Sequence, residues 1–190
     1  GCSHADTYKA LNEVVKNVHG DGHVFSDIGC YTPGALPPFE SINSCVDMGA
    51  SITMAKGAAD AGMRPAVAVI GDSTFCHSGM TGLLDAVIEH TPILVMILDN
   101  SATAMTGGQD SHAFGRLEKI CLGLGVDREH LHLINPVPKK HDDFVALIRR
   151  ELDYEGVSVI IPTRECIQTL KKRSRKKSAV SPAGKQGGSQ

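Results

Sequence analysis

The chain has 190 residues, of which 42% are hydrophobic and 21% charged, enough for one globular domain with a sizeable core. Its net charge of −2 joins two unlike parts: residues 1–170 carry 12 Lys and Arg against all 21 Asp and Glu, a charge of −9, whereas residues 171–190 carry seven Lys and Arg and no acid. The acidic part argues against nucleic-acid binding, no apolar run approaches the 18 residues of a membrane span, and we expect a domain over 1–170 followed by a basic, flexible tail or linker over 171–190.

Helical and extended patterns alternate along the chain. Apolar residues at helical spacing predict helices, and short apolar runs such as AVAVI and ILVMIL predict strands. In chain order the pattern predicts a helix over Ala5–Val18, a strand over His23–Ile28, a loop over Tyr31–Ser44, a short apolar segment over Cys45–Met48, a helix over Gly49–Ala61, a strand over Ala66–Ile70, a helix over Thr81–Glu89, a strand over Ile93–Leu98, a loop over Asn100–Ala113, a helix over Arg116–Leu124, a strand over His130–Ile134, a helix over Asp142–Leu152 and a strand over Val157–Ile161.

The predicted strands are continuous apolar runs rather than alternating ones. Such runs are typical of strands buried on both faces, in a parallel sheet with helices on each side. The predicted fold class is therefore α/β, with a doubly wound, mainly parallel sheet flanked by helices. Folds of this class bind ligands at the carboxyl ends of the strands, so the residues that follow the strands are the candidates for function.

The cysteines and the start of the chain indicate a reduced, cytoplasmic setting. Six cysteines are widely spaced without a C-x-x-C pair, and no signal peptide opens the sequence. Four of them are interpreted as packing residues: Cys2, Cys45, Cys76 and Cys121. Five histidines lack metal-ligand spacing and are interpreted as surface or structural residues: His90, His112, His130, His132 and His141.

Two polar groups follow two of the predicted strands. Gly71-Asp72-Ser73 comes directly after AVAVI, and Asp99-Asn100 comes directly after ILVMIL. With one helix between them, two neighbouring parallel strands could present Asp72 and Asn100 side by side. A carboxylate and an amide oxygen suit Mg²⁺, and Ser73 with the N–H groups after Asp72 could hold phosphate oxygens. The alternative is that both groups are ordinary turns with a helix cap.

The paired groups also resemble the thiamine diphosphate-binding motif, in which G-D-G is followed, a little under 30 residues later, by an Asn at the end of an apolar strand. Ser73 and Asp99 depart from the usual Gly and Asn. Four blocks in order are similar to the α subunit of the indolepyruvate:ferredoxin oxidoreductase family, with the resemblance running from Gly1 to about Leu170. These blocks are DIGCYTPGALPP (27–38), MGAS (48–51), GDSTFCHSG (71–79) and LDNSATAMTGGQ (98–109).

The resemblance implies two cofactors, thiamine diphosphate and Mg²⁺. Asp72, Asn100 and the backbone carbonyl of Ala102 would hold the Mg²⁺. The residues implied on the diphosphate side are Gly71, Ser73, Thr103 and, in the following turn, Met105.

The remaining implied residues lie on the reactive side of the cofactor. Cys30, Met48 and Gly49 would line the aminopyrimidine or thiazolium, and His4 and His77 would act on the substrate side as proton carriers or carboxylate donors. Each has a structural alternative: Cys30 as an inert buried thiol, and His77 as a residue near a helix start that touches nothing relevant.

Two clusters of small residues have a structural interpretation as well. Gly49–Ser51 and Gly57–Ala59 could allow a helix to pack closely on the sheet, and we expect packing to account for much of their presence.

The resemblance further implies an activity and partners. The activity is oxidative decarboxylation of a 2-oxo acid, an arylpyruvate such as indolepyruvate, to acyl-CoA, CO₂ and reduced ferredoxin. The implied partners are a pyrimidine-binding domain and a domain or subunit with iron–sulfur clusters, and we expect an oligomer. The opening GCSH is similar to the end of the family's C-P-G-C-x-H block, so we expect a fragment that binds cofactor but does not turn over alone.

Two alternatives stay open. One is the cofactor-binding subunit of a non-oxidative thiamine-dependent 2-oxo acid decarboxylase. The other is a protein that has the thiamine-binding fold without catalysis. Binding of nucleic acid or an acidic membrane surface by the tail is disfavoured, because a solvated linker explains a basic run more simply.

Overall fold

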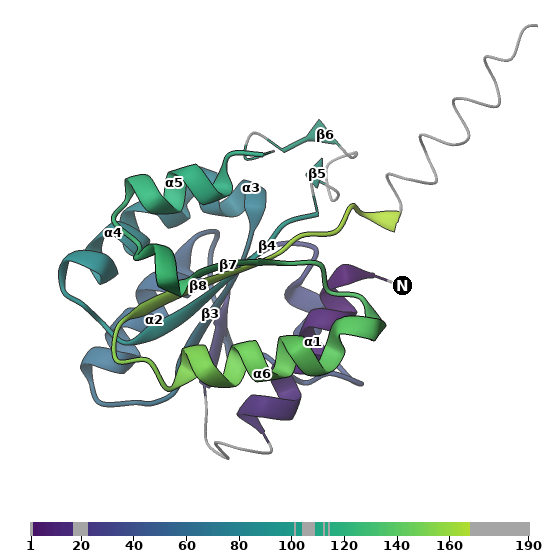
Figure 1. The fold of residues 1–190 in the computed structure, drawn as a ribbon, viewed down its shortest axis with the longest axis horizontal. Helices are drawn as coiled ribbons and strands as arrows, with labels where there is room; N and C mark the ends of the chain where they lie inside the picture. Colours follow the sequence, from purple (N-terminus) through teal and green to yellow (C-terminus); the bar gives the residue numbers. More distant parts are fainter. Residues whose placement is uncertain are drawn as a thin grey trace, which may run out of the picture.

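The computed structural model describes residues 2–16, 23–100, 102–103, 109–111, 113 and 115–167, with only the backbone described at 102–103 and 109–110. In it, a six-stranded parallel sheet lies between two layers of helices (Figure 1). The fold class predicted from the apolar runs is confirmed. No helix in these described ranges is both long and apolar enough to cross a membrane.

The elements follow one another in the predicted order. The sheet has the strand order β2-β1-β3-β4-β8-β7, made of β1 (His23–Ser26), β2 (Ser44–Cys45), β3 (Ala66–Gly71), β4 (Ile93–Leu98), β7 (Leu131–Ile134) and β8 (Val157–Pro162). The α-helices are α1 (Ser3–Val15), α2 (Ala50–Asp60), α3 (Asp72–Thr74), α4 (Met80–Ile88), α5 (Leu117–Gly123) and α6 (His141–Leu152).

Each central strand buries both of its faces. In β3, Ile70 packs in a cluster with residues of α2, α4 and α5, whereas its neighbour Val69 packs in a second cluster with residues of α1 and α6. Because successive side chains of a strand point to opposite faces, the sheet needs apolar residues at every position to bury both. Helices α1 and α6 lie side by side on one face of the sheet, as Figure 1 shows.

The differences from the predicted elements are local. The helix predicted to begin at Thr81 begins earlier, because α3 and a π-helical turn (Phe75–Gly79) continue into α4 without a break. Serine, threonine and glycine are weak helix formers, so the sequence pattern does not predict a helical segment here. The fully buried Phe75 packs this segment against the core. The loop predicted over Asn100–Ala113 contains a short antiparallel pair, β5 (Ala102–Thr103) and β6 (Gln109–Asp110).

The register of two central strands positions the candidate site. Gly71 at the end of β3 lies opposite Leu98 at the end of β4. The next residues along each strand, Asp72 and Asp99, therefore leave the sheet at the same level, with Asn100 one position further. The prediction that neighbouring parallel strands present these groups together is confirmed.

Candidate cofactor-binding site

Asp72 is a buried carboxylate with one oxygen unsatisfied. Its side chain is only 3% exposed, and Oδ1 accepts a hydrogen bond from the backbone N–H of Ser73 at 2.7 Å. Oδ2 is buried and has no hydrogen-bond partner among the described residues. Burial and, to a smaller extent, the nearby Asp99 carboxylate raise the pKa of Asp72 to about 6, against the opposing hydrogen bonds from the Ser73 N–H and the Ser111 hydroxyl.

Two serine hydroxyls, of Ser73 and Ser111, lie close to each other beside Asp72. The Ser73 hydroxyl lies 3.3 Å from the Ser111 hydroxyl, which joins the turn after β3 to the segment after β6. Asp99 is held by its backbone, since its N–H donates to Pro162 O and its carbonyl accepts from Arg164 N, both at 3.0 Å. These contacts tie the ends of β4 and β8 together beneath the carboxylates.

Asn100, Cys30 and His4 form a second group next to the first. The Asn100 side chain is 3% exposed, and its Nδ2 donates to the Cys30 sulfur at 3.2 Å. On the other side of that sulfur lies His4 Nδ1, at 3.8 Å. The three residues come from the segment just after β4, from the turn after β1 and from the start of α1, so Cys30 lies between two residues that are 96 positions apart in the sequence.

A buried hydrogen-bond network around Asp27 supports both groups. The Tyr31 hydroxyl donates to Asp27 Oδ1, while Oδ2 accepts from the Gly49 N–H at 3.1 Å and from the Ser51 hydroxyl at 2.8 Å. Burial raises the pKa of Asp27, and the hydrogen bonds from Tyr31 and Ser51 work against that shift. One carboxylate thus fixes the turn after β1 to the start of α2.

Tyr31 also explains why a glycine precedes Asp72. A Cβ added at Gly71 would lie 2.5 Å from the Tyr31 ring, far inside van der Waals contact. The ring therefore packs directly on the backbone at the end of β3. Gly71 was predicted as a cofactor contact, and what the structure gives for it is this packing role.

Met48 and Gly49, predicted to form a wall of the cofactor site, directly precede α2. Gly49 has φ +93°, and a Cβ there would lie 2.2 Å from the Ser78 hydroxyl. That hydroxyl donates to the Met48 carbonyl at 2.8 Å and lies 3.1 Å from Nδ1 of the exposed His77. Met48 is 45% exposed. Gly49 thus allows a close approach, but to the π-helical turn that contains Ser78 and not to the sheet as expected, and His77 lies close to the predicted cofactor wall.

Some predicted residues remain partly or wholly outside this description. Only the backbone of Ala102 and Thr103 is described, in β5, and Met105 lies outside the described residues. Residues 171–190, predicted as a tail or linker, lie outside them as well. The roles assigned to these residues stay predictions.

The packing interpretation fails at several positions. A Cβ at Gly57 would meet nothing within 4 Å, so this glycine makes no close helix–sheet contact. Cys2 and Cys45 are exposed rather than packed, because both lie at the ends of elements on the surface. Cys121, by contrast, is buried in the core, as the packing interpretation predicts.

Two of the histidines interpreted as surface or structural residues have a structural role. His130 and His132 both bond to the buried Glu151.

Sequence reasoning assigned no role to two carboxylates of the site, Asp27 and Asp99. Both are buried, and both directly follow a strand of the sheet. At Asp99 that position was the available signal, because a charged residue at the end of an apolar strand is costly to bury unless something binds it. At Asp27 it was not, because the strand was predicted to run on to Ile28, whereas β1 ends at Ser26.

The donor set fits a hard cation. The unsatisfied Oδ2 of Asp72, the neighbouring Asp99 carboxylate and the Asn100 amide supply oxygen atoms rather than nitrogen or sulfur ligands. No cluster of three or more His, Cys, Asp or Glu suited to a metal occurs among the residues that the structure describes. A cation here would therefore also need ligands such as backbone carbonyls or phosphate oxygens.

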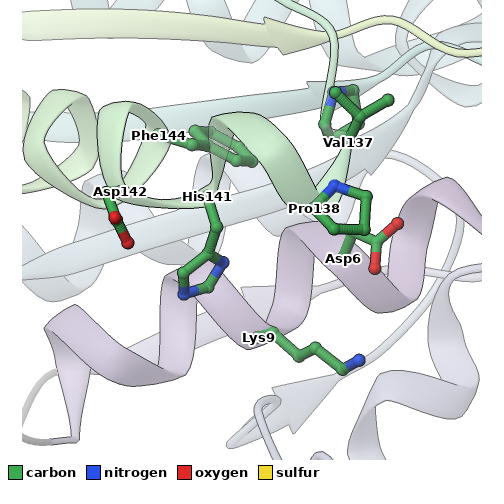
Figure 2. Close-up of a pocket in the computed structure, with 8 residues that line it drawn as sticks. Asp6, Lys9, Val137, Pro138, His141, Asp142 and Phe144 are labelled. Carbon is green, nitrogen blue, oxygen red and sulfur yellow. The ribbon is translucent and has the colours of Figure 1, made fainter.

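A separate cavity of about 420 Å³ lies between α1 and the start of α6 (Figure 2). Asp6 and Lys9 line it from α1, and Val137, His141 and Phe144 line it from the other side. None of the predicted cofactor residues borders it. Two of its polar lining residues are paired within the protein, since Asp6 bonds to Arg164 and His141 bonds to Glu13, each at 2.8 Å.

Comparison with known families decides the identity of this fold. The profile described as "Thiamine pyrophosphate enzyme, C-terminal TPP binding domain" matches residues 27–172. The chain belongs to this family. The match covers the turn after β1 and the ends of β3 and β4, so every element of the candidate site except α1 falls within the TPP-binding domain.

Curated relatives carry one name. The chain is 37% identical to indolepyruvate oxidoreductase subunit IorA of Archaeoglobus fulgidus over 87% of its own length, and 31% identical to the subunit of the same name from Pyrococcus abyssi, again over 87%. It spans only 28% of the length of each of these relatives.

Solved structures confirm the fold. A 2-oxoglutarate:ferredoxin oxidoreductase from Magnetococcus marinus superposes with a TM-score of 0.70 at 17% identity, covering 90% of this chain and 67% of that one. The thiamine diphosphate-dependent 4-hydroxybenzoylformate decarboxylase of Rhodococcus jostii superposes with a TM-score of 0.64 at 16% identity, covering 85% of this chain and 33% of that one.

Proposed function

We propose that this TPP-binding domain holds thiamine diphosphate and Mg²⁺ as part of a 2-oxo acid:ferredoxin oxidoreductase that acts in the cytoplasm on arylpyruvates such as indolepyruvate. The proposal rests on one observation above others, the buried and unsatisfied Oδ2 of Asp72 beside Asn100 on the neighbouring strand. A folded protein seldom leaves a buried carboxylate oxygen without a partner unless a ligand supplies it. A cation is the ligand that a carboxylate and an amide oxygen suit.

The residues of this chain would divide the work of holding the cofactor. Asp72 and Asn100, with the backbone carbonyl of Ala102, would ligate the cation. The Ser73 hydroxyl, 3.3 Å from Ser111, would face the diphosphate, as would Thr103 and Met105. The wall of Gly49 and Met48, fixed through Asp27 and Ser78, would exclude water from the ring side together with Cys30.

When bound, thiamine diphosphate supplies the chemistry that decarboxylates a 2-oxo acid. Two histidines of this chain would assist at the substrate. His4 has a buried Nε2 without a partner among the described residues, which could bond a substrate carboxylate. His77 is exposed beside Met48 and could carry a proton to or from the reacting group.

The proposed enzyme needs further parts. Several apolar side chains near the site are exposed: Ile28 at 45%, Leu36 at 61% and Val46 at 54%. Apolar surface of this kind is typical of an interface, which supports a pyrimidine-binding domain covering the cofactor and an oligomeric assembly. Iron–sulfur clusters on a partner domain or subunit would pass electrons to ferredoxin, and coenzyme A would take the acyl group. The clusters and the pyrimidine-binding domain are inferred from the family resemblance of the sequence. Ferredoxin and coenzyme A belong to the Magnetococcus marinus oxidoreductase, and the IorA relatives are much longer than this chain, which leaves room for further domains.

Calorimetric titration of the chain with thiamine diphosphate, with and without Mg²⁺, tests the cofactor site. We expect saturable binding that requires the cation. Absence of binding at millimolar cofactor would overturn the assignment and favour a protein that retains the fold without catalysis.

Turnover tests the need for partners. The chain mixed with Mg²⁺, thiamine diphosphate, coenzyme A and an arylpyruvate should form no acyl-CoA. Complete oxidation by the chain alone would contradict the proposal. Aldehyde and CO₂ without electron transfer, from a purified complex that contains no iron, would instead indicate the non-oxidative decarboxylase.

A further inference from the structure

We infer that Cys30 is a positioning residue that fixes which way the Asn100 amide faces, and that His4 fixes the thiol of Cys30 in turn. The inference rests on the proposed Mg²⁺ site and deepens it. It starts from a chain of two contacts between buried or half-buried side chains, His4 Nδ1 to Cys30 Sγ at 3.8 Å and Cys30 Sγ to Asn100 Nδ2 at 3.2 Å.

An asparagine ligates a cation with only one end of its amide. The oxygen is an acceptor that can bind the metal, whereas the NH₂ group is a donor that cannot. The two ends have almost the same shape, and the terminal torsion of the side chain is soft, so shape alone does not choose between them. A hydrogen-bonding neighbour on one side has to make the choice.

Cys30 is a neighbour of this kind. Because Nδ2 of Asn100 donates to the Cys30 sulfur, the amide oxygen points away from the sulfur. With the amide turned over, an oxygen would face the sulfur and the NH₂ group would face the cation. The sulfur therefore favours the ligating orientation as long as it acts as an acceptor.

His4 keeps the sulfur an acceptor. A thiol has a single hydrogen, and when that hydrogen points toward His4 Nδ1, the sulfur lone pairs are left for Asn100. The arrangement requires His4 to carry its ring proton on Nε2. His4 is 7% exposed and packs edge-on against Tyr31, so the ring is held in place. The tautomer of His4, in the first turn of α1, thus fixes the direction of the thiol hydrogen bond and, through it, the orientation of the Asn100 amide after β4.

A double-mutant cycle tests the inference. Mg²⁺ affinity is measured by calorimetry at saturating thiamine diphosphate for the wild type, Cys30→Ala, Asn100→Asp and the double variant. Cys30→Ala should weaken Mg²⁺ binding about tenfold, the size of one hydrogen bond. In the Asn100→Asp background the same change should have less than about a twofold effect, because a carboxylate presents an oxygen in either orientation.

The control is Cys45→Ala, which removes another thiol of this region, one that contacts the Asp27 carbonyl rather than Asn100. It should leave Mg²⁺ affinity unchanged. Equal losses from Cys30→Ala in both backgrounds would show that Cys30 acts through packing and would overturn the inference. Unchanged affinity in the wild-type background would overturn it as well. A wild type that binds neither Mg²⁺ nor thiamine diphosphate would refute the proposed function, and the inference with it.

A second readout needs no cofactor. In the ¹⁵N-labelled chain, the side-chain NH₂ resonances of Asn100 should shift in Cys30→Ala and move back toward the wild-type position in Cys30→Ser, whose hydroxyl can accept. The resonances of Asn12, whose Nδ2 donates to Phe39 O at 2.6 Å, should stay in place. Asn100 resonances that do not respond to Cys30→Ala would overturn the inference even if Mg²⁺ affinity changed.

Discussion

Two buried carboxylates of this protein lie in opposite circumstances. Asp72 at the end of β3 leaves Oδ2 without a partner among the described residues, and burial raises its pKa to about 6. Glu151 near the end of α6 is equally buried but is fully bonded. Its partners are His130, His132, Arg150 and Ser158, each within 2.9 Å of a carboxylate oxygen.

The pKa of Glu151 moves the other way. Burial acts to raise it, but the hydrogen bonds from His130, Ser158 and Arg150 outweigh burial and hold it below its usual value. Glu151 thus stabilises the fold as a charged group, joining β7, α6 and β8. Asp72 as a charged group destabilises the fold until something binds it. Burial alone therefore does not distinguish the two carboxylates, whereas the hydrogen bonding of their oxygens does.

The largest expected effect comes from Asp72→Asn. The amide cannot neutralise a cation, so Mg²⁺-dependent binding of thiamine diphosphate should weaken at least about 100-fold. Because the variant also removes an unsatisfied charge, its melting temperature should equal or exceed that of the wild type. Calorimetry and thermal unfolding measure the two effects. The control is Asp85→Asn, a change at an exposed carboxylate, which should leave cofactor binding unchanged. A lower melting temperature for Asp72→Asn would show that Asp72, like Glu151, stabilises the fold as a charged group.

Glu151→Gln should show the reverse pattern. Removing a charge that four neighbours satisfy leaves buried donors without an acceptor, and the free energy of unfolding should fall by about 3 kcal/mol. Cofactor affinity of the folded protein should stay within about twofold of the wild type. Urea unfolding and calorimetry on the same preparation provide the measurement. A cofactor-binding defect in a stably folded Glu151→Gln would show that the two regions are coupled.

The pH dependence of stability should separate the two carboxylates by sign, in protein free of divalent cations. A raised pKa means that Asp72 holds its proton in the folded state, so its contribution is present below pH 3.8 and is lost as pH rises through about 6. Asp72→Asn should therefore gain stability over the wild type between pH 4 and 7, by up to about 3 kcal/mol. The lowered pKa of Glu151 gives a contribution that is present above 4.5 and is lost at lower pH.

Urea titrations at half-unit pH steps compare the three proteins. The difference between wild type and Asp72→Asn should change only on the side above pH 4. The difference between wild type and Glu151→Gln should shrink only below about 4.5. Parallel curves for all three would mean that neither carboxylate has the environment described above.

The smallest expected effect concerns the exposed partner of Glu151. The Arg150 side chain is 64% exposed, and a solvent-exposed ion pair contributes little. Arg150→Ala should lower the free energy of unfolding by less than about 1 kcal/mol, whereas His130→Ala, which removes a half-buried partner stacked on Tyr154, should cost more. Chemical denaturation measures the free energy of unfolding of both variants. A larger loss from Arg150→Ala than from His130→Ala would show that the charge of the partner matters more than its burial.

The apolar runs were sufficient to predict the parallel sheet, because a strand buried on both faces has no polar position to spare. They also predicted that Asp72 and Asn100 would follow neighbouring parallel strands, and the register of those strands does bring their carboxyl ends to the same edge of the sheet. Patterning could not reveal the π-helical turn after Asp72, whose residues are weak helix formers held by packing. Nor could it separate Gly49, which needs φ +93° and a close approach to Ser78, from Gly57, which needs neither.

The sequence by itself determined the fold class, the order of the elements and the edge of the sheet that carries the site, because these depend on periodicity and on the position of polar residues after strands. Only the tertiary structure decided which oxygen of Asp72 lacks a partner, that Asp27 joins Gly49 to Tyr31, and that Cys30 lies between His4 and Asn100. The contacts from Asp27 to Gly49, from His4 to Cys30 and from Cys30 to Asn100 join residues 22, 26 and 70 positions apart in the sequence, and no local pattern specifies how such side chains meet.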